Sequence, residues 1–146
     1  MKITCSSLIF VLLFGVALAQ SQTRGQVIPP ESVKISFDKH FPQAIKMNWK
    51  VWTRGYAVDF LVKDFKMEAV FSSSGVWQFT DVTLPPEHVP ASVKEHVARQ
   101  YQGAQVISRG YHDADRGSYY IIKVRYRGGL QKLLYDDNGK FLRAQR

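Results

Sequence analysis

Pro30-Glu31-Ser32-Val33-Lys34 occurs a second time, with one substitution, as Pro90-Ala91-Ser92-Val93-Lys94. Beyond this match, apolar or aromatic side chains recur at every fourth position in both segments: Val33, Phe37 and Phe41, then Val93, Val97 and Tyr101. A spacing of four places each trio on one face of a helix, so the sequence predicts a short amphipathic helix in each segment. The proline that opens each segment suits the first helical turn, where a missing N–H leaves nothing unpaired.

After each predicted helix, the apolar period changes from four to two. In the first copy, apolar side chains alternate over residues 45–51 and 56–62, on either side of a Thr53-Arg54-Gly55 turn. Alternation of this kind is typical of strands with one buried face. Residues 120–126 repeat the second of these strands, shifted by 64 positions instead of 60. We therefore expect the connection around 112–117 to be about four residues longer in the second copy.

Each copy then closes with another hairpin. Its turn is Ser72-Ser73-Ser74-Gly75 in the first copy and Asp136-Asp137-Asn138-Gly139 in the second, and both glycines suit a turn position with positive φ. The sequence thus predicts an α+β fold made of two tandem repeats, each with one helix packed on a roughly four-stranded antiparallel sheet.

The N-terminus has the features of a secretory signal peptide. Met1-Lys2 is followed by an apolar run, and Ala17-Leu18-Ala19 supplies the small residues that precede a cleavage site. We predict the following organisation: signal peptide 1–19, flexible leader 20–28, first repeat 29–82, linker 83–89 and second repeat 90–146. The expected location is periplasmic or secreted, with no membrane span after signal cleavage.

Composition narrows the classes of partner and site. The 146 residues include 20 Lys and Arg against 12 Asp and Glu, a formal net charge of +8. A basic chain suggests nucleic acid, but export argues against it, so we predict no nucleic-acid partner. The single cysteine, Cys5, lies within the predicted signal peptide. A disulfide framework and a multi-thiolate metal site are therefore excluded for the exported chain.

Several short segments carry a resemblance to a known family. They are Phe41-Pro42-Gln43-Ala44, Gly55-Tyr56-Ala57-Val58 and the hairpins 71–75 and 135–139. With the duplicated order, they make the chain similar to the PepSY-like family of secreted bacterial proteins, which is associated with the fold of the beta-lactamase inhibitor protein. The resemblance extends from about Pro30 to Arg143. It implies two sheets side by side that offer a concave face to another protein, and it transfers no site residues.

Alternation also separates the two faces of each predicted sheet. It places Trp52 opposite Trp49 and Tyr119 opposite Tyr120, so that Trp52 and Tyr119 point away from the core. Such aromatic side chains beside basic ones have the composition of a protein-binding hot spot. The predicted binding residues are Trp52, Trp77, Tyr119, Lys50, Arg54, Arg125 and Arg127. The same aromatic groups would also suit sugars, or could simply form cross-strand pairs within the sheet.

No catalytic set or cofactor motif is recognisable, so we predict no enzyme activity and no cofactor. The function that we predict is an exported, non-enzymatic binding module, inhibitor-like in one form, which docks a protein or anionic partner in the cell envelope. The alternative is a calcium- or zinc-binding envelope protein, with His112, Asp113, Asp115, Asp136 and Asp137 as weak metal candidates. Ordinary turns explain these five residues equally well. A hydrolase whose residues converge from distant positions is a third possibility.

Overall fold

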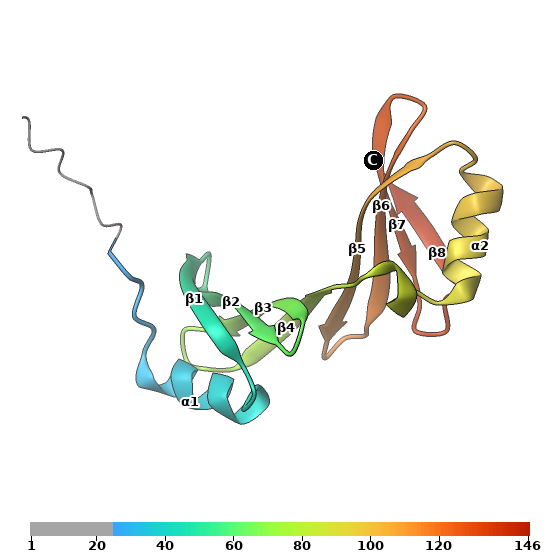
Figure 1. Ribbon diagram of the computed structural model, residues 1–146. Coiled ribbons are helices and arrows are strands. Elements are labelled where there is room, and N and C mark those ends of the chain that lie inside the picture. The colour runs from blue at the N-terminus through green and yellow to red at the C-terminus, as the bar shows by residue number, and fades with distance from the viewer. Residues whose placement is uncertain (1–24) are drawn as a thin grey trace, which may run out of the picture.

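The computed structural model describes residues 25–146 (Figure 1). The predicted signal peptide 1–19 and residues 20–24 of the predicted leader lie outside this part of the chain. The elements, in chain order, are α1 (Glu31–His40), β1 (Ile45–Trp52), β2 (Gly55–Val62), β3 (Phe65–Ser72), β4 (Trp77–Thr83), the 3₁₀ helix η1 (Pro86–His88), α2 (Ala91–Gln100), β5 (Gln105–Ala114), β6 (Tyr119–Tyr126), β7 (Gly129–Tyr135) and β8 (Phe141–Gln145). Within residues 25–146, no helix is long and apolar enough to cross a membrane.

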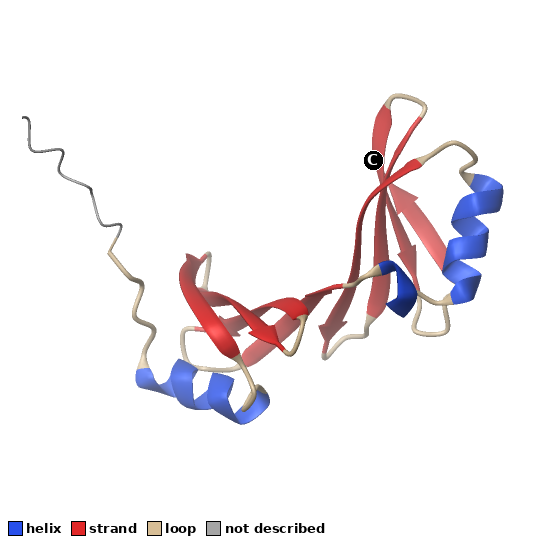
Figure 2. Ribbon diagram, viewed as in Figure 1, coloured by secondary structure: helices blue, strands red, loops and turns tan. Residues whose placement is uncertain are grey.

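The eight strands form one antiparallel sheet in which strand order follows chain order, from β1 at one edge to β8 at the other. Figure 2 distinguishes the strands, in red, from the helices, in blue. Each strand pairs with its neighbours in the sequence through short connections. The predicted α+β class, with one helix and about four antiparallel strands in each unit, is confirmed. The first unit here means α1 with β1–β4, and the second unit means α2 with β5–β8.

The two units have equivalent cores. Four buried positions of the first core recur 64 residues later in the second: Val58 and Ile122, Phe60 and Val124, Ala69 and Leu133, Phe71 and Tyr135. Val33 of α1 and Val93 of α2, which are 60 residues apart, also belong to the two clusters and are both fully buried. Strand register places both helices on the same side of the sheet, and Figure 1 shows them on the outer side of its bend.

The four extra residues of the second unit are divided between a strand and a connection: β5 is two residues longer than β1, and the connection to β6 (115–118) is two longer than the connection to β2 (53–54), not four as expected. His112, Asp113 and Ala114 were expected in a connection, but they belong to β5, which has ten residues where β1 has eight. The longer end of β5 pairs with β4, with Phe79 opposite Ala114 and Asp81 opposite His112. Backbone pairing thus joins the two units into one sheet, because hydrogen-bonding groups at the edge of β4 find partners on β5.

A glycine in each closing hairpin lies against the first turn of the helix. Gly75 has φ 91°, and a Cβ at this position would lie 2.6 Å from the carbonyl oxygen of Ser32. Gly139 has φ 76°, and a Cβ there would meet the side-chain hydroxyl of Ser92 instead of the helix backbone. The positive φ favours glycine at both positions, and the contact with the helix backbone adds a steric reason at Gly75.

The ring of His96 packs against the second core. Its Nδ1 lies 3.0 Å from the hydroxyl of Tyr135, and its ring stacks on Phe141 with 4.6 Å between centroids. Burial lowers the pKa of His96 below its ordinary value of 6.5, and the charge of Arg99 lowers it further. In the first unit, His40 stacks in a similar way on Trp77.

We predict that Gly75→Ala lowers the free energy of unfolding by about 2–4 kcal/mol, because it adds a backbone clash to the strain of a positive φ. Gly128→Ala is the matched control: Gly128 has φ 78° with nothing within 4 Å of an added Cβ. In this variant only the backbone strain of the positive φ applies, so the free energy of unfolding should fall by about 1–2 kcal/mol. Urea unfolding of both variants measures the difference, and equal losses would show that the hairpin does not press on α1.

We also predict that acid weakens the protein through His96. Because the folded state lowers the pKa of His96 below 6.5, the unfolded chain binds this proton more readily. The free energy of unfolding is therefore expected to fall as the pH drops below about 6.5. In His96→Phe, the part of the pH dependence of the free energy of unfolding that comes from His96 should disappear. Urea unfolding between about pH 7.5 and pH 5 tests this, and an unchanged slope in the variant would contradict it.

Candidate functional site

The candidate site is the sheet surface opposite the helices, which we call the open face. The two units meet at an angle, and the open face lies on the inner side of the bend (Figure 1). Several residues on it are small: Gly55, Ala57, Gly110 and Ala114. These small side chains create a hollow where the two units join, and larger neighbouring side chains fill part of it, since Ala57 is fully buried.

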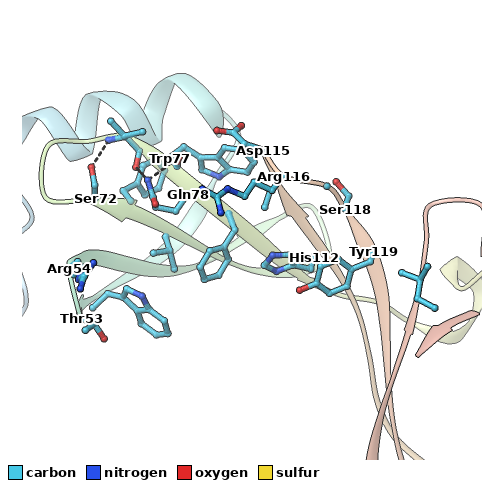
Figure 3. A pocket seen from close by; sticks show the side chains of 18 residues that line it. Thr53, Arg54, Ser72, Trp77, Gln78, His112, Asp115, Arg116, Ser118 and Tyr119 are labelled. Atoms are coloured by element: carbon cyan, nitrogen blue, oxygen red, sulfur yellow. Dashed lines mark hydrogen bonds between the residues drawn. The ribbon is translucent and has the colours of Figure 1, made fainter. Parts of the chain in front are cut away.

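Four rings form a row across this hollow, which we call the aromatic row: Trp52 of β1, Phe79 of β4, His112 of β5 and Tyr119 of β6. The centroid of Trp52 lies 6.4 Å from that of Phe79, and Phe79 lies 5.1 Å from His112. His112 stacks on Tyr119 at 4.7 Å, and Figure 3 shows these two rings side by side. Phe79 and His112 come from the two strands that meet at the junction of the units, so the row exists only in the joined sheet.

A groove with a volume of about 1060 Å³ surrounds the aromatic row. Its rim carries polar groups that Figure 3 shows around the rings: Arg54, Gln78, Asp115 and Arg116. Among the seven predicted binding residues, the structure brings four to this groove: Trp52, Arg54, Trp77 and Tyr119. The groove therefore combines apolar rings with both signs of charge, which is the composition of a recognition surface.

Trp77 reaches the groove from the other side of the sheet. A bulge in β4 places Trp77 opposite Phe71, so its ring packs on the α1 side. There it stacks on His40, and its Nε1 donates a hydrogen bond of 2.9 Å to the hydroxyl of Thr80. The expectation that Trp77 shares the face of Trp52 is therefore wrong, because the bulge changes the alternation.

Lys50 lies on the open face but is already paired. Its Nζ lies 2.9 Å from a carboxylate oxygen of Asp59 and 2.6 Å from one of Glu68. These two acids are directly opposite each other on β2 and β3. The hydrogen bond with Glu68, more than that with Asp59, raises the pKa of Lys50, against the opposing effect of burial. Lys50 thus offsets the repulsion between two carboxylates.

The second unit reverses this charge. The positions 64 residues after Asp59 and Glu68 are Lys123 and Lys132, which are again directly opposite each other. Arg125 and Arg143 lie on the same face, and none of these four cations has an ion pair within residues 25–146. Like charges at directly opposed positions destabilise a sheet. We call these four residues the cationic patch, and its unpaired charges favour an anionic ligand.

Arg127 does not belong to this surface. It lies in the β6–β7 turn with φ 48°, and its guanidinium is 5.0 Å from the ring centroid of Tyr126. Sequence reasoning also missed Phe79 and His112 in the aromatic row, and Lys123 and Lys132 in the cationic patch. The charge reversal was readable from the 64-residue offset. The aromatic row required knowledge of which strands pair between the units.

The structure does not bring the five metal candidates together. His112 points to the open face, where its Nδ1 lies 2.7 Å from Asp81, whereas Asp113 points to the helix side and accepts a hydrogen bond from Ser118. Asp136 accepts two backbone N–H groups within its own turn, and Asp137 accepts the Tyr111 hydroxyl. Residues 25–146 contain no group of three or more His, Cys, Asp or Glu side chains that could hold a metal ion.

Comparison with known proteins identifies similar sequences and folds. A family described as "Putative beta-lactamase-inhibitor-like, PepSY-like" matches residues 54–143. No curated protein sequence matches the chain. The fold is similar to that of a BLIP-like protein from Bacteroides fragilis, with a TM-score of 0.75 and 18% identity over 83% of this chain and 88% of that one. A DUF2874 family protein from Bacteroides uniformis has a TM-score of 0.73 and 21% identity, over 81% and 89% of the two chains. A protein described as periplasmic, from Bacteroides eggerthii, has a TM-score of 0.72 and 22% identity, over 82% and 89%.

We predict that Lys50→Met lowers the free energy of unfolding by about 0.5–1 kcal/mol, because Asp59 and Glu68 then repel each other without a cation between them. Urea unfolding at low and high salt measures this, and the loss should shrink in high salt. The double variant Lys50→Met/Glu68→Gln is the control, since it removes the repulsion and should recover most of the loss. A loss of equal size in the double variant would show that Lys50 acts through packing of its alkyl chain.

Proposed function

Because the chain belongs to the PepSY-like family, we propose that it is an exported, non-enzymatic binding module whose open face docks a protein partner in an inhibitor-like manner. The partner that fits this surface is a convex, acidic region of another protein.

The observation that carries this proposal is the aromatic row. A ring on a sheet surface that no helix covers is exposed to water, and Trp52 keeps 44% of its surface accessible. Removing such apolar surface from water contributes about 25 cal/mol per Å². Trp and Tyr are also the residues that dominate protein interfaces. Because the row spans both units, one partner would contact both at once.

The shape of the open face supports a protein as the partner, instead of a small molecule or a flat membrane. The groove has a volume of about 1060 Å³, just above the roughly 300–1,000 Å³ that small-molecule sites occupy. The angle between the two units makes the open face concave (Figure 1). A concave surface suits a protruding part of a partner, because a flat membrane would contact only the ends of the two sheets.

Charge supports an acidic partner. The cationic patch extends the open face beyond Tyr119 along β6, where Lys123 and Arg125 follow at alternate positions. In the first unit, Lys50 is paired with Asp59 and Glu68, whereas the lysines at the positions that correspond to these two acids are unpaired in the second unit. Complementary charges accelerate association and select the partner.

Two further observations support the remaining parts of the proposal. The predicted signal peptide 1–19 and the periplasmic description of the protein from Bacteroides eggerthii both favour export. For the absence of catalysis, the support is the sequence, in which no catalytic set or cofactor motif is recognisable. His112 is paired with Asp81 and stacks on Tyr119 as part of the aromatic row.

Photo-crosslinking at position 119 tests the docking face. We expect Tyr119→p-benzoylphenylalanine to crosslink to a discrete protein in envelope extracts of the producing cells. The second change Trp52→Ala should reduce the yield at least about tenfold, because interface aromatics often contribute 1–2 kcal/mol or more. Lys123→Glu/Lys132→Glu should reduce it as well, and added salt should have the same effect.

Ile35 provides the matched control. It lies on α1, on the outer side of the bend, and is 61% exposed. The same photoreactive residue at position 35 should give no such product. An identical product at position 35, or a yield at position 119 that Trp52→Ala leaves unchanged, would contradict the proposed face.

A further inference from the structure

We propose that the groove between α2 and β5 of the second unit binds an aliphatic monocarboxylate, with Arg109 holding the carboxylate and valine side chains holding the chain. This site lies on the helix side of the sheet and is independent of the open face.

The groove exists because the second unit lacks rings that fill the same space in the first. Phe37 of α1 contacts Trp49 of β1 at 5.3 Å and Phe60 of β2 at 5.0 Å, both edge to face. The equivalent residues of the second unit are Val97, Arg109 and Val124. The equivalence follows from register, since Trp49 pairs with Val58, and Arg109 pairs with Ile122 at the position 64 residues later. Two rings are thus replaced by valines, and a third by arginine.

The resulting groove has a volume of about 510 Å³, within the roughly 300–1,000 Å³ of small-molecule sites. Its floor is aliphatic: Val89, Val93 and Ile122 line it, and each exposes 4% of its surface or less. Val97 and Val106 form part of its walls. Saturated, branched side chains without polar atoms favour an aliphatic ligand, whose burial needs no hydrogen bonds.

Arg109 supplies the polar end of the site. It is half-buried on the helix side of β5, where the first unit has Trp49, and it lines the groove. Neither Arg109 nor Lys94, which lines the same groove from α2, has an ion pair within residues 25–146. A cation beside apolar surface loses hydration without gaining a partner. A carboxylate restores both charge and hydrogen bonds, because a guanidinium binds it through two parallel N–H groups.

Decanoate is the probe for this site. We expect titration with sodium decanoate, below its micelle concentration, to give saturable heat in calorimetry. The NMR signals of Val93, Val97 and Ile122 should shift. Arg109→Gln should weaken binding about tenfold, the loss of one charge-assisted contact. Decyltrimethylammonium is the control ligand, because it has the same chain and the opposite charge. Its head group gains nothing from Arg109, so Arg109→Gln should not lower its affinity for the groove.

A filled groove provides the second variant. Val97→Phe/Arg109→Trp restores two of the three rings of the first unit and should abolish decanoate binding, with a melting temperature equal to or above that of the parent. Arg109→Gln keeps the proposal testable should the double variant not fold. Three results would overturn the proposal. Decanoate could shift the NMR signals of His112 and Tyr119 instead, it could bind Arg109→Gln as tightly as the parent, or it could fail to bind. Each of these results leaves the crosslinking at position 119 unaffected, since that test concerns the opposite side of the sheet.

Discussion

The pairing of β4 with β5 is the interaction on which the rest of the structure depends. Phe79 to Thr83 face Gly110 to Ala114 in register, and Asp81 contacts His112 at 2.7 Å across this junction. Each unit could bury its core without the other, because each has its own helix and four strands. The junction instead decides the open face. It brings rings from both units into one row and sets the angle that makes the surface concave (Figure 1).

Duplication produced two units with the same backbone and different surfaces. The features that both units share are steric. Both have a hairpin glycine against a serine of the helix and a buried valine in the first helical turn. The units differ at positions where packing restricts the side chain less. Asp59 and Glu68 around Lys50 correspond to the unpaired Lys123 and Lys132. An aromatic core corresponds to a valine-lined groove with Arg109 beside it. Both differences give the second unit unpaired positive charge, on one side of the sheet for a protein and on the other for a small anion.

Much of the fold was predictable because its signals are local. Periods of four and two, with proline and glycine at element ends, identified both helices and the alternation of the strands. They also placed Trp52 and Tyr119 away from the core. Trp77 and His112 were assigned less well, for definable reasons. A bulge in β4 shifts Trp77 to the α1 side, and the extension of β5 converts the residues around His112 from a connection to a strand. Bulges and strand extensions depend on the partner strand, and no local period reports them.

The sequence alone therefore determined the repeated helix-and-sheet unit and many of the residues that each core buries, because burial follows from the spacing of apolar side chains along one chain segment. It was wrong for Ile45, Met47 and Val51 of the edge strand β1, which alternate as a buried face would but are exposed. It did not determine which surface residues act together. Trp52, Phe79, His112 and Tyr119 come from four strands of two units, and Arg109 faces a groove only because Val97 replaces a ring on the neighbouring helix. Such neighbourhoods depend on the register between strands and on the packing between helix and sheet. Both are set by contacts between segments far apart in the chain, so only the tertiary structure decided them.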